Sequence, residues 1–199
     1  MRVLGPSSEA EMIACFLGAE LTSTRFGPEI RAALAARSLP ESLLTHPDLA
    51  DAEANAARRA LLAETRGYGE NRELFDSTFP IKVTWTRAVL TPAELAAVRY
   101  MDYSYWIELS GGTRLPADAA KLIKAGHRAY GIPNDGAIAA GQAAKAAVRF
   151  PPLILVGETH DNLVCLEGHL RLTAYALAGF PAPVECLLGS APDMTLWAR

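Results

Sequence analysis

The order of elements expected over residues 151–189 constrains the fold most. Two short apolar segments, 151–157 (PPLILVG) and 162–166 (NLVCL), are joined by a polar turn and have the composition of buried strands. An alanine-rich helical pattern begins near His169, and a further apolar segment follows at 182–189. This order of strand, turn, strand, helix and strand predicts a small mixed sheet with the helix packed on it.

The first third of the chain has helical patterns. In the segment 7–21, Ser8 and Glu11 have the spacing of a capping box, and apolar residues then recur on one face. Similar patterns cover 27–37 and 51–69, the latter ending in glycines that are typical of a helix C-terminus. The sequence therefore predicts helices in this region.

The pattern changes near residue 80. Residues 81–90 alternate and are β-branched, which favours a strand, and a helix over 91–100 follows with Thr91 and Glu94 as a capping box. Residues 101–116 have the composition of a loop.

The predicted fold class is α+β, a small mixed-sheet core with an N-terminal α-helical extension. We expect the extension to comprise residues 1–78 and to pack on a core of residues 79–199. Its apolar helix faces need burial, because short helices in water owe most of their stability to packing.

Composition narrows the classes of partner. Half of the 199 residues are hydrophobic, and the net charge of −3 comes without a basic stripe, so nucleic acid is not an expected partner. No apolar run reaches about 18 residues and no signal-peptide pattern is visible, so we expect a cytoplasmic protein without a membrane segment. The three cysteines lack metal-site spacing and are expected to be reduced thiols.

A group of polar residues separates the strand pattern at 162–166 from the helix that follows. Glu167, Gly168, His169 and Arg171 lie within five positions. A helix N-terminus offers unpaired N–H groups and a partial positive charge, and the glycine lets backbone approach a ligand. His169 and Arg171 add donors, which makes the turn suitable for phosphate, while Glu167 suits Mg²⁺ or a substrate hydroxyl. The alternative is a local salt bridge between Arg171 and Glu167.

The same residues resemble the ParB/sulfiredoxin-like superfamily. The closest local match is to the free serine kinases, whose loop is Asp-Gly-His-x-Arg: Glu167 replaces the Asp, while Gly168, His169 and Arg171 match. Only Gly168 and Arg171 fit the Gly-Glu-Arg-Arg box of the partition proteins. Sulfiredoxin has its catalytic cysteine where this chain has His169, so sulfiredoxin chemistry is not expected.

The resemblance implies a nucleotide-binding kinase that uses ATP or ADP with Mg²⁺. The acceptor would be the hydroxyl of a small metabolite such as an amino acid. Gly168, His169 and Arg171 would bind phosphate, and Glu167 would be a catalytic residue and metal ligand. The alternative is a non-catalytic nucleotide-sensing or protein-interaction module without DNA binding.

The segment 101–116 supplies the remaining candidates, since in this superfamily the corresponding segment commonly lines the site. Glu108 and Asp102 are candidates for the carboxylate that orients or deprotonates the acceptor hydroxyl. The candidate substrate-pocket residues are Tyr103, Tyr105, Trp106 and Arg114. The alternative is that the aromatic residues belong to the core and Glu108 is solvated.

Overall fold

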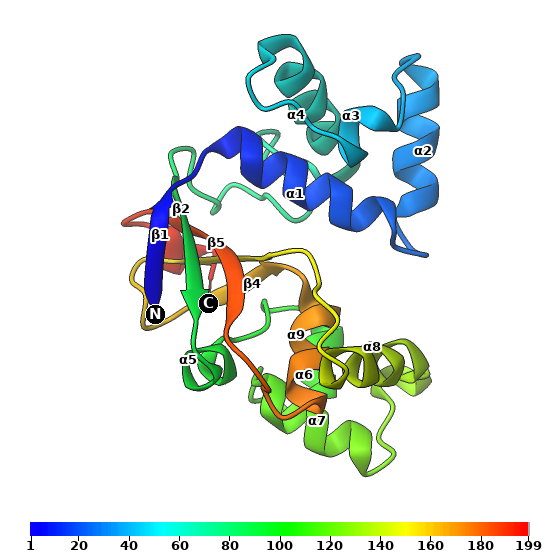
Figure 1. The fold of residues 1–199 in the computed structure, drawn as a ribbon, viewed down its shortest axis with the longest axis vertical. Coiled ribbons are helices and arrows are strands. Elements are labelled where there is room, and N and C mark those ends of the chain that lie inside the picture. Colours follow the sequence, from blue (N-terminus) through cyan, green and yellow to red (C-terminus); the bar gives the residue numbers. More distant parts are fainter. Residues whose placement is uncertain (199) are drawn as a thin grey trace. The chain divides into compact units, whose positions relative to one another are not determined.

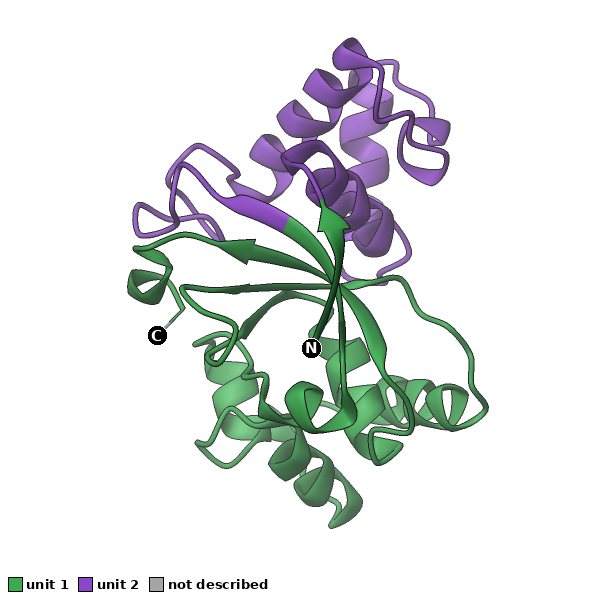
Figure 2. Ribbon diagram, turned by 60° about the vertical axis from the view of Figure 1, so that its left-hand side comes forward, with its two compact units in different colours: residues 1–6, 86–199 green, residues 7–85 purple. Residues whose placement is uncertain are grey.

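The computed structural model describes residues 1–198 and divides into two compact units. Unit 1 comprises residues 1–6 and 86–199, and unit 2 comprises residues 7–85 (Figure 2). Residues 1–6, predicted to belong to the helical extension, are a strand in the sheet of unit 1. Packing of residues 7–78 on the core stays a prediction.

Unit 1 is built on a five-stranded mixed sheet (Figure 1). Its strand order is β1 (Arg2–Pro6), β2 (Thr84–Leu90), β5 (Val184–Ser190), β3 (Leu153–Gly157) and β4 (Val164–Glu167). β1 is antiparallel to β2, β3 is antiparallel to β4, and β3 is parallel to β5. The predicted α+β class is confirmed, and a specifically ParB-like core stays a prediction.

Strand β3, next to β5 in the sheet, is buried because its sequence is continuously apolar. All five residues of β3 are buried, as expected for a strand covered on both faces. Helix α9 (His169–Leu177) buries seven of its nine residues. Leu172 and Tyr175 of α9 belong to the same core cluster as Leu155 of β3. The predicted packing of this helix on the sheet is therefore confirmed.

The other helices of unit 1 differ in part from the predictions. They are α5 (Pro92–Ala97), α6 (Ser104–Leu109), α7 (Pro116–Lys124) and α8 (Asp135–Lys145). The prediction of a loop over 101–116 was wrong at α6, because Tyr103 at its N-cap makes no side-chain capping bond that could mark the start. The helix predicted over 91–100 ends at Ala97, and Val98 is already extended.

Unit 2 is helical, as predicted. Its helices are α1 (Glu9–Leu21), α2 (Gly27–Ala36), α3 (Ser42–Thr45) and α4 (Ala52–Arg66). Ser8 accepts a bond from the N–H of Glu11 at the start of α1, and Gly67 in a left-handed conformation ends α4. In residues 1–198, no helix is long and apolar enough to cross a membrane.

Candidate functional site

The predicted phosphate turn lies where β4 ends and α9 begins. Gly168 is the N-cap of α9 with φ 104° and ψ 24°, a conformation that side-chain-bearing residues rarely adopt. A Cβ at this position would lie 2.6 Å from Cδ2 of Leu153 and 3.0 Å from Nη2 of Arg171. The backbone itself therefore requires glycine here, in addition to any role in ligand approach.

Arg171 is engaged inside the protein. Its Nη1 donates to the carbonyl oxygens of Pro151 at 2.8 Å and Pro152 at 2.7 Å, and its Nη2 donates to Oε1 of Glu167 at 3.0 Å. The side chains of Arg171 and Glu167 are 12% and 19% exposed. The local salt bridge, which was the alternative interpretation, is therefore present. A phosphate role for Arg171 stays a prediction, and these three bonds leave two of its five N–H donors for it.

His169 belongs to a stack of rings. Its side chain lies nearly parallel to Trp106, with centroids 4.9 Å apart and an interplanar angle of 15°. Tyr105 contacts Trp106 edge-on at 4.9 Å, and Tyr100 stacks on Trp106 at 4.9 Å. We call these four residues the aromatic stack. It brings the predicted phosphate turn against two of the predicted pocket residues.

An unpredicted strand-like contact explains this proximity. The N–H of Arg99 donates to the carbonyl of Leu163 at 2.9 Å, and the N–H of Cys165 donates to the carbonyl of Arg99 at 2.8 Å. The backbone at Arg99 thus forms a parallel bridge with Val164 of β4. The following residue, Tyr100, shares a 2.7 Å hydrogen bond between its hydroxyl and that of Thr173. The extended backbone after α5 therefore leads the chain towards the end of β4 where α9 starts.

Arg114 lies beside the backbone of Tyr100. Nε of Arg114 donates to the carbonyl of Tyr100 at 2.8 Å, and the N–H of Tyr100 donates to the carbonyl of Arg114 at 2.8 Å. Burial lowers the pKa of the Arg114 guanidinium, while the charge of Asp102 acts in the opposite direction. Nη2 of Arg114 is buried and makes no hydrogen bond within residues 1–198, so one strong donor is left for an acceptor.

Glu108 and Tyr103 lie at opposite ends of α6. Oε1 of Glu108 lies 3.8 Å from Nε2 of His127, and the side chain of Glu108 is 46% exposed. Tyr103, at the N-cap, is 50% exposed. Of the two candidate carboxylates, Asp102 is therefore the one whose charge acts on another predicted site residue.

Within residues 1–198, no group of three or more His, Cys, Asp or Glu side chains could hold a metal ion. Mg²⁺ is commonly bound through one or two carboxylates together with substrate phosphates and water. Oε1 of Glu167 accepts from the Arg171 guanidinium, so Oε2 is the oxygen that Glu167 could offer to such a site.

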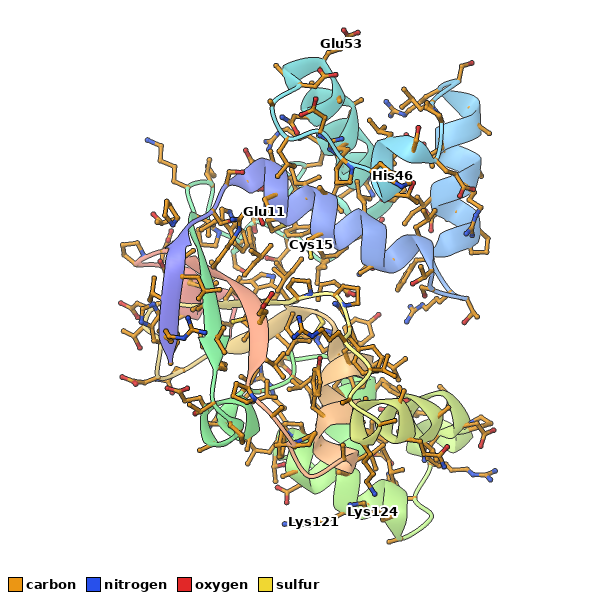
Figure 3. All side chains as sticks on the ribbon, viewed as in Figure 1. Glu11, Cys15, His46, Glu53, Lys121 and Lys124 are labelled. Carbon is orange, nitrogen blue, oxygen red and sulfur yellow. The ribbon has the colours of Figure 1, made fainter. Side chains whose placement is uncertain are left out.

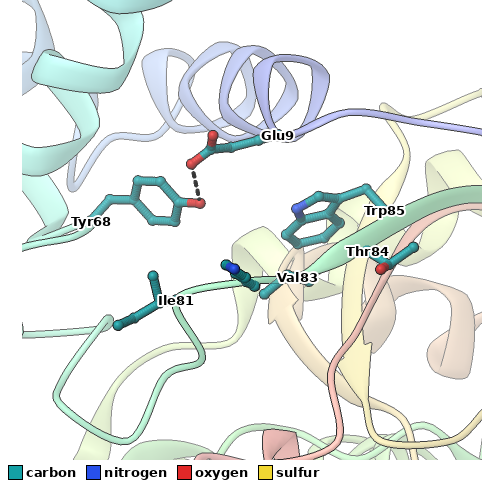
Figure 4. A pocket seen from close by; sticks show the side chains of 7 residues that line it. Glu9, Tyr68, Ile81, Val83, Thr84 and Trp85 are labelled. Carbon is teal, nitrogen blue, oxygen red and sulfur yellow. Dashed lines mark hydrogen bonds between the residues drawn. The ribbon is translucent and has the colours of Figure 1, made fainter.

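Two cavities lie outside this region. One, of 220 Å³ in unit 2, is lined by Glu9, Tyr68 and residues 81–85 (Figure 4). In it, the Tyr68 hydroxyl donates to Glu9 at 2.7 Å, and Glu9 pairs with Arg59. The other, of 300 Å³, lies between α7, α8 and α9 in unit 1.

Comparison with known proteins finds no relative of this chain. The chain matches no family model, no curated protein and no solved structure. The resemblance to the ParB/sulfiredoxin-like superfamily therefore rests on the residues of the turn and the order of the elements around it.

Proposed function

We propose that unit 1 binds a nucleotide at the N-terminal turn of α9 and uses it as the phosphate donor for a small hydroxyl-bearing metabolite. The observation that carries the proposal is the contact between His169, the first residue of α9, and Trp106, which brings a helix N-terminus against aromatic side chains. A helix N-terminus is an element suited to anions. Phosphate and base of a nucleotide need these two surfaces close together.

The phosphate group would lie over the first turn of α9. No side chain caps this turn, and Leu170 within it is 49% exposed, so the turn reaches solvent. Its N–H groups and the helix dipole favour an anion. The unused Nη2 donor of Arg114 would add a charge-assisted bond once the ligand draws it out.

The nucleobase would stack on the aromatic residues of α6. Tyr103 is half exposed, and Tyr105 is partly buried against Trp106. Stacking of a base on an aromatic side chain is worth about 1–3 kcal/mol and tolerates different bases. This arrangement therefore supports nucleotide binding without specifying which base is preferred.

Phosphoryl transfer would use two carboxylates, those of Asp102 and Glu167. Asp102 would orient the acceptor hydroxyl, and Glu167 would hold Mg²⁺ on the phosphates through Oε2 while Oε1 keeps its bond to Arg171. The choice of an amino-acid-like acceptor comes from the resemblance of the EGHLR turn to the free serine kinases.

A second candidate is a nucleotide-responsive module without turnover. It is favoured by the bonds that Arg171 makes to Pro151, Pro152 and Glu167. A nucleotide phosphate that attracts Arg171 would release the segment before β3 and so change the conformation of unit 1. In that case nucleotide binding would change the conformation of unit 1 without transfer of phosphate to an acceptor.

Titration calorimetry with ATP, ADP and CTP in the presence of Mg²⁺ tests binding. We expect Arg114→Gln to weaken nucleotide affinity by about tenfold, because it removes one charge-assisted bond. Arg128→Gln, at an exposed arginine outside the site, is the matched control and should bind like the wild type. No binding at millimolar nucleotide, or equal affinity of the Arg114 variant and wild type, would contradict the proposal.

Nucleotide consumption distinguishes the two candidates. With a panel of amino acids as acceptors, a kinase should form a phosphorylated product, and Asp102→Asn should bind nucleotide normally while losing most turnover. Nucleotide binding without any product, accompanied by faster hydrogen exchange before β3, would select the nucleotide-responsive module instead.

A further inference from the structure

The cavity between α7, α8 and α9 has a mostly apolar lining. Ile123 of α7, Ile138 of α8 and Leu177 of α9 supply its hydrocarbon surface, and the amide of Gln142 is its neutral polar group. Its volume of 300 Å³ is at the lower end of the range for small-molecule sites. The cavity therefore suits a compact ligand rather than a whole nucleotide.

Gly141 brings the helices together beside this cavity. A Cβ on Gly141 would lie 2.9 Å from Cβ of Leu177, so α8 and α9 meet there without an intervening side chain. Glycine inside a helix costs about 1 kcal/mol relative to alanine. The C-terminal end of α9 thus forms one wall of the cavity. Leu177 lies roughly 12 Å along the helix from His169.

Two lysines line the same cavity. Lys124 belongs to the last turn of α7 and Lys145 to the last turn of α8. Neither ammonium group forms a salt bridge within residues 1–198, whereas Lys121 on α7 pairs with Asp118 at 2.9 Å. Figure 3 labels Lys121 and Lys124 at the same end of α7. Two cations without anionic partners thus border an apolar cavity.

We propose that this cavity binds a small organic carboxylate with a compact hydrocarbon body. The body would replace water on Ile123, Ile138 and Leu177, and the carboxylate would lie between Lys124 and Lys145. Gln142 would donate its amide N–H to the same carboxylate. This site is separate from the nucleotide site, since it lies at the other end of α9.

Phenylacetate and its neutral isostere phenylacetamide are suitable probes. NMR of the backbone amides of the full chain detects their binding. We expect phenylacetate to shift amides of α7, α8 and the end of α9, and to bind about tenfold more tightly than phenylacetamide. Equal affinity of the two probes, or shifts confined to other elements, would overturn the proposal.

Charge reversal locates the carboxylate. The double variant Lys124→Glu with Lys145→Glu should weaken phenylacetate binding by about tenfold or more and leave phenylacetamide unaffected. Lys121→Glu is the matched control on the same helix end and should change neither affinity. Ile138→Ser, at a side chain that is 42% exposed, should weaken both probes without unfolding the protein. Since Lys121→Glu changes the net charge by half as much as the double variant, a loss of half as much binding free energy in the Lys121 variant would show that net charge, and no site, attracts the carboxylate.

Discussion

Replacing Gly168 by alanine is expected to lower the free energy of unfolding of unit 1 by about 2–5 kcal/mol. Two costs combine. The φ of 104° is unfavourable for any residue with a Cβ, and the new methyl group would lie 2.6 Å from Cδ2 of Leu153 in the buried strand β3. Hydrogen exchange of the β3 amides measures this loss, because these amides exchange only when the core of unit 1 opens.

Gly179→Ala is the matched control for the steric part of this effect. Gly179 follows the other end of α9 with φ 81°, and a Cβ there meets no atom within 4 Å. We expect this variant to lose only about 1 kcal/mol, from backbone conformation alone. Equal losses in the two variants would show that contact with Leu153 contributes nothing. A Gly168→Ala protein of unchanged stability would contradict the left-handed conformation of Gly168 and its close approach to Leu153.

Arg171→Ala is expected to destabilise unit 1 by about 2–4 kcal/mol. The substitution leaves the carbonyl groups of Pro151 and Pro152 without their donor and Glu167 without its counter-charge. Because the Arg171 side chain is only 12% exposed, water replaces these bonds poorly. Chemical denaturation measures the loss of stability, and hydrogen exchange of the β3 amides shows that the loss concerns unit 1.

Two further variants separate the bonds of Arg171. Glu167→Gln keeps both bonds to the carbonyl groups and should lower the free energy of unfolding by about 1 kcal/mol. In Arg171→Lys the ammonium group cannot reach all three acceptors at once, so its loss of stability should lie between those of Glu167→Gln and Arg171→Ala. An Arg171→Ala protein of wild-type stability that binds nucleotide 10- to 100-fold more weakly would show instead that Arg171 serves the phosphate. The comparison therefore decides between the structural and the ligand-binding role of this residue.

The sequence by itself determined the features that depend on neighbouring residues. The Thr91 capping box, the strand pattern before it and the apolar run of β3 are local signals, and the structure has each of them. β2 begins at Thr84 and β3 at Leu153, three and two residues after the starts of their patterns. Gly168 is a local signal too, because a glycine between an apolar strand and an alanine-rich helix marks their junction. These signals depend on backbone preferences and side-chain periodicity, which short segments already contain.

Only the tertiary structure decided which groups these residues contact. His169 could have faced solvent or a ligand, yet it stacks on Trp106 because Arg99 pairs with β4 and brings the following segment alongside α9. The helix pattern over 91–100 gave way after Ala97, where extended backbone gains bonds to Leu163 and Cys165. Such choices depend on burial and hydrogen bonding between residues that are distant in sequence, and these outweigh local propensity.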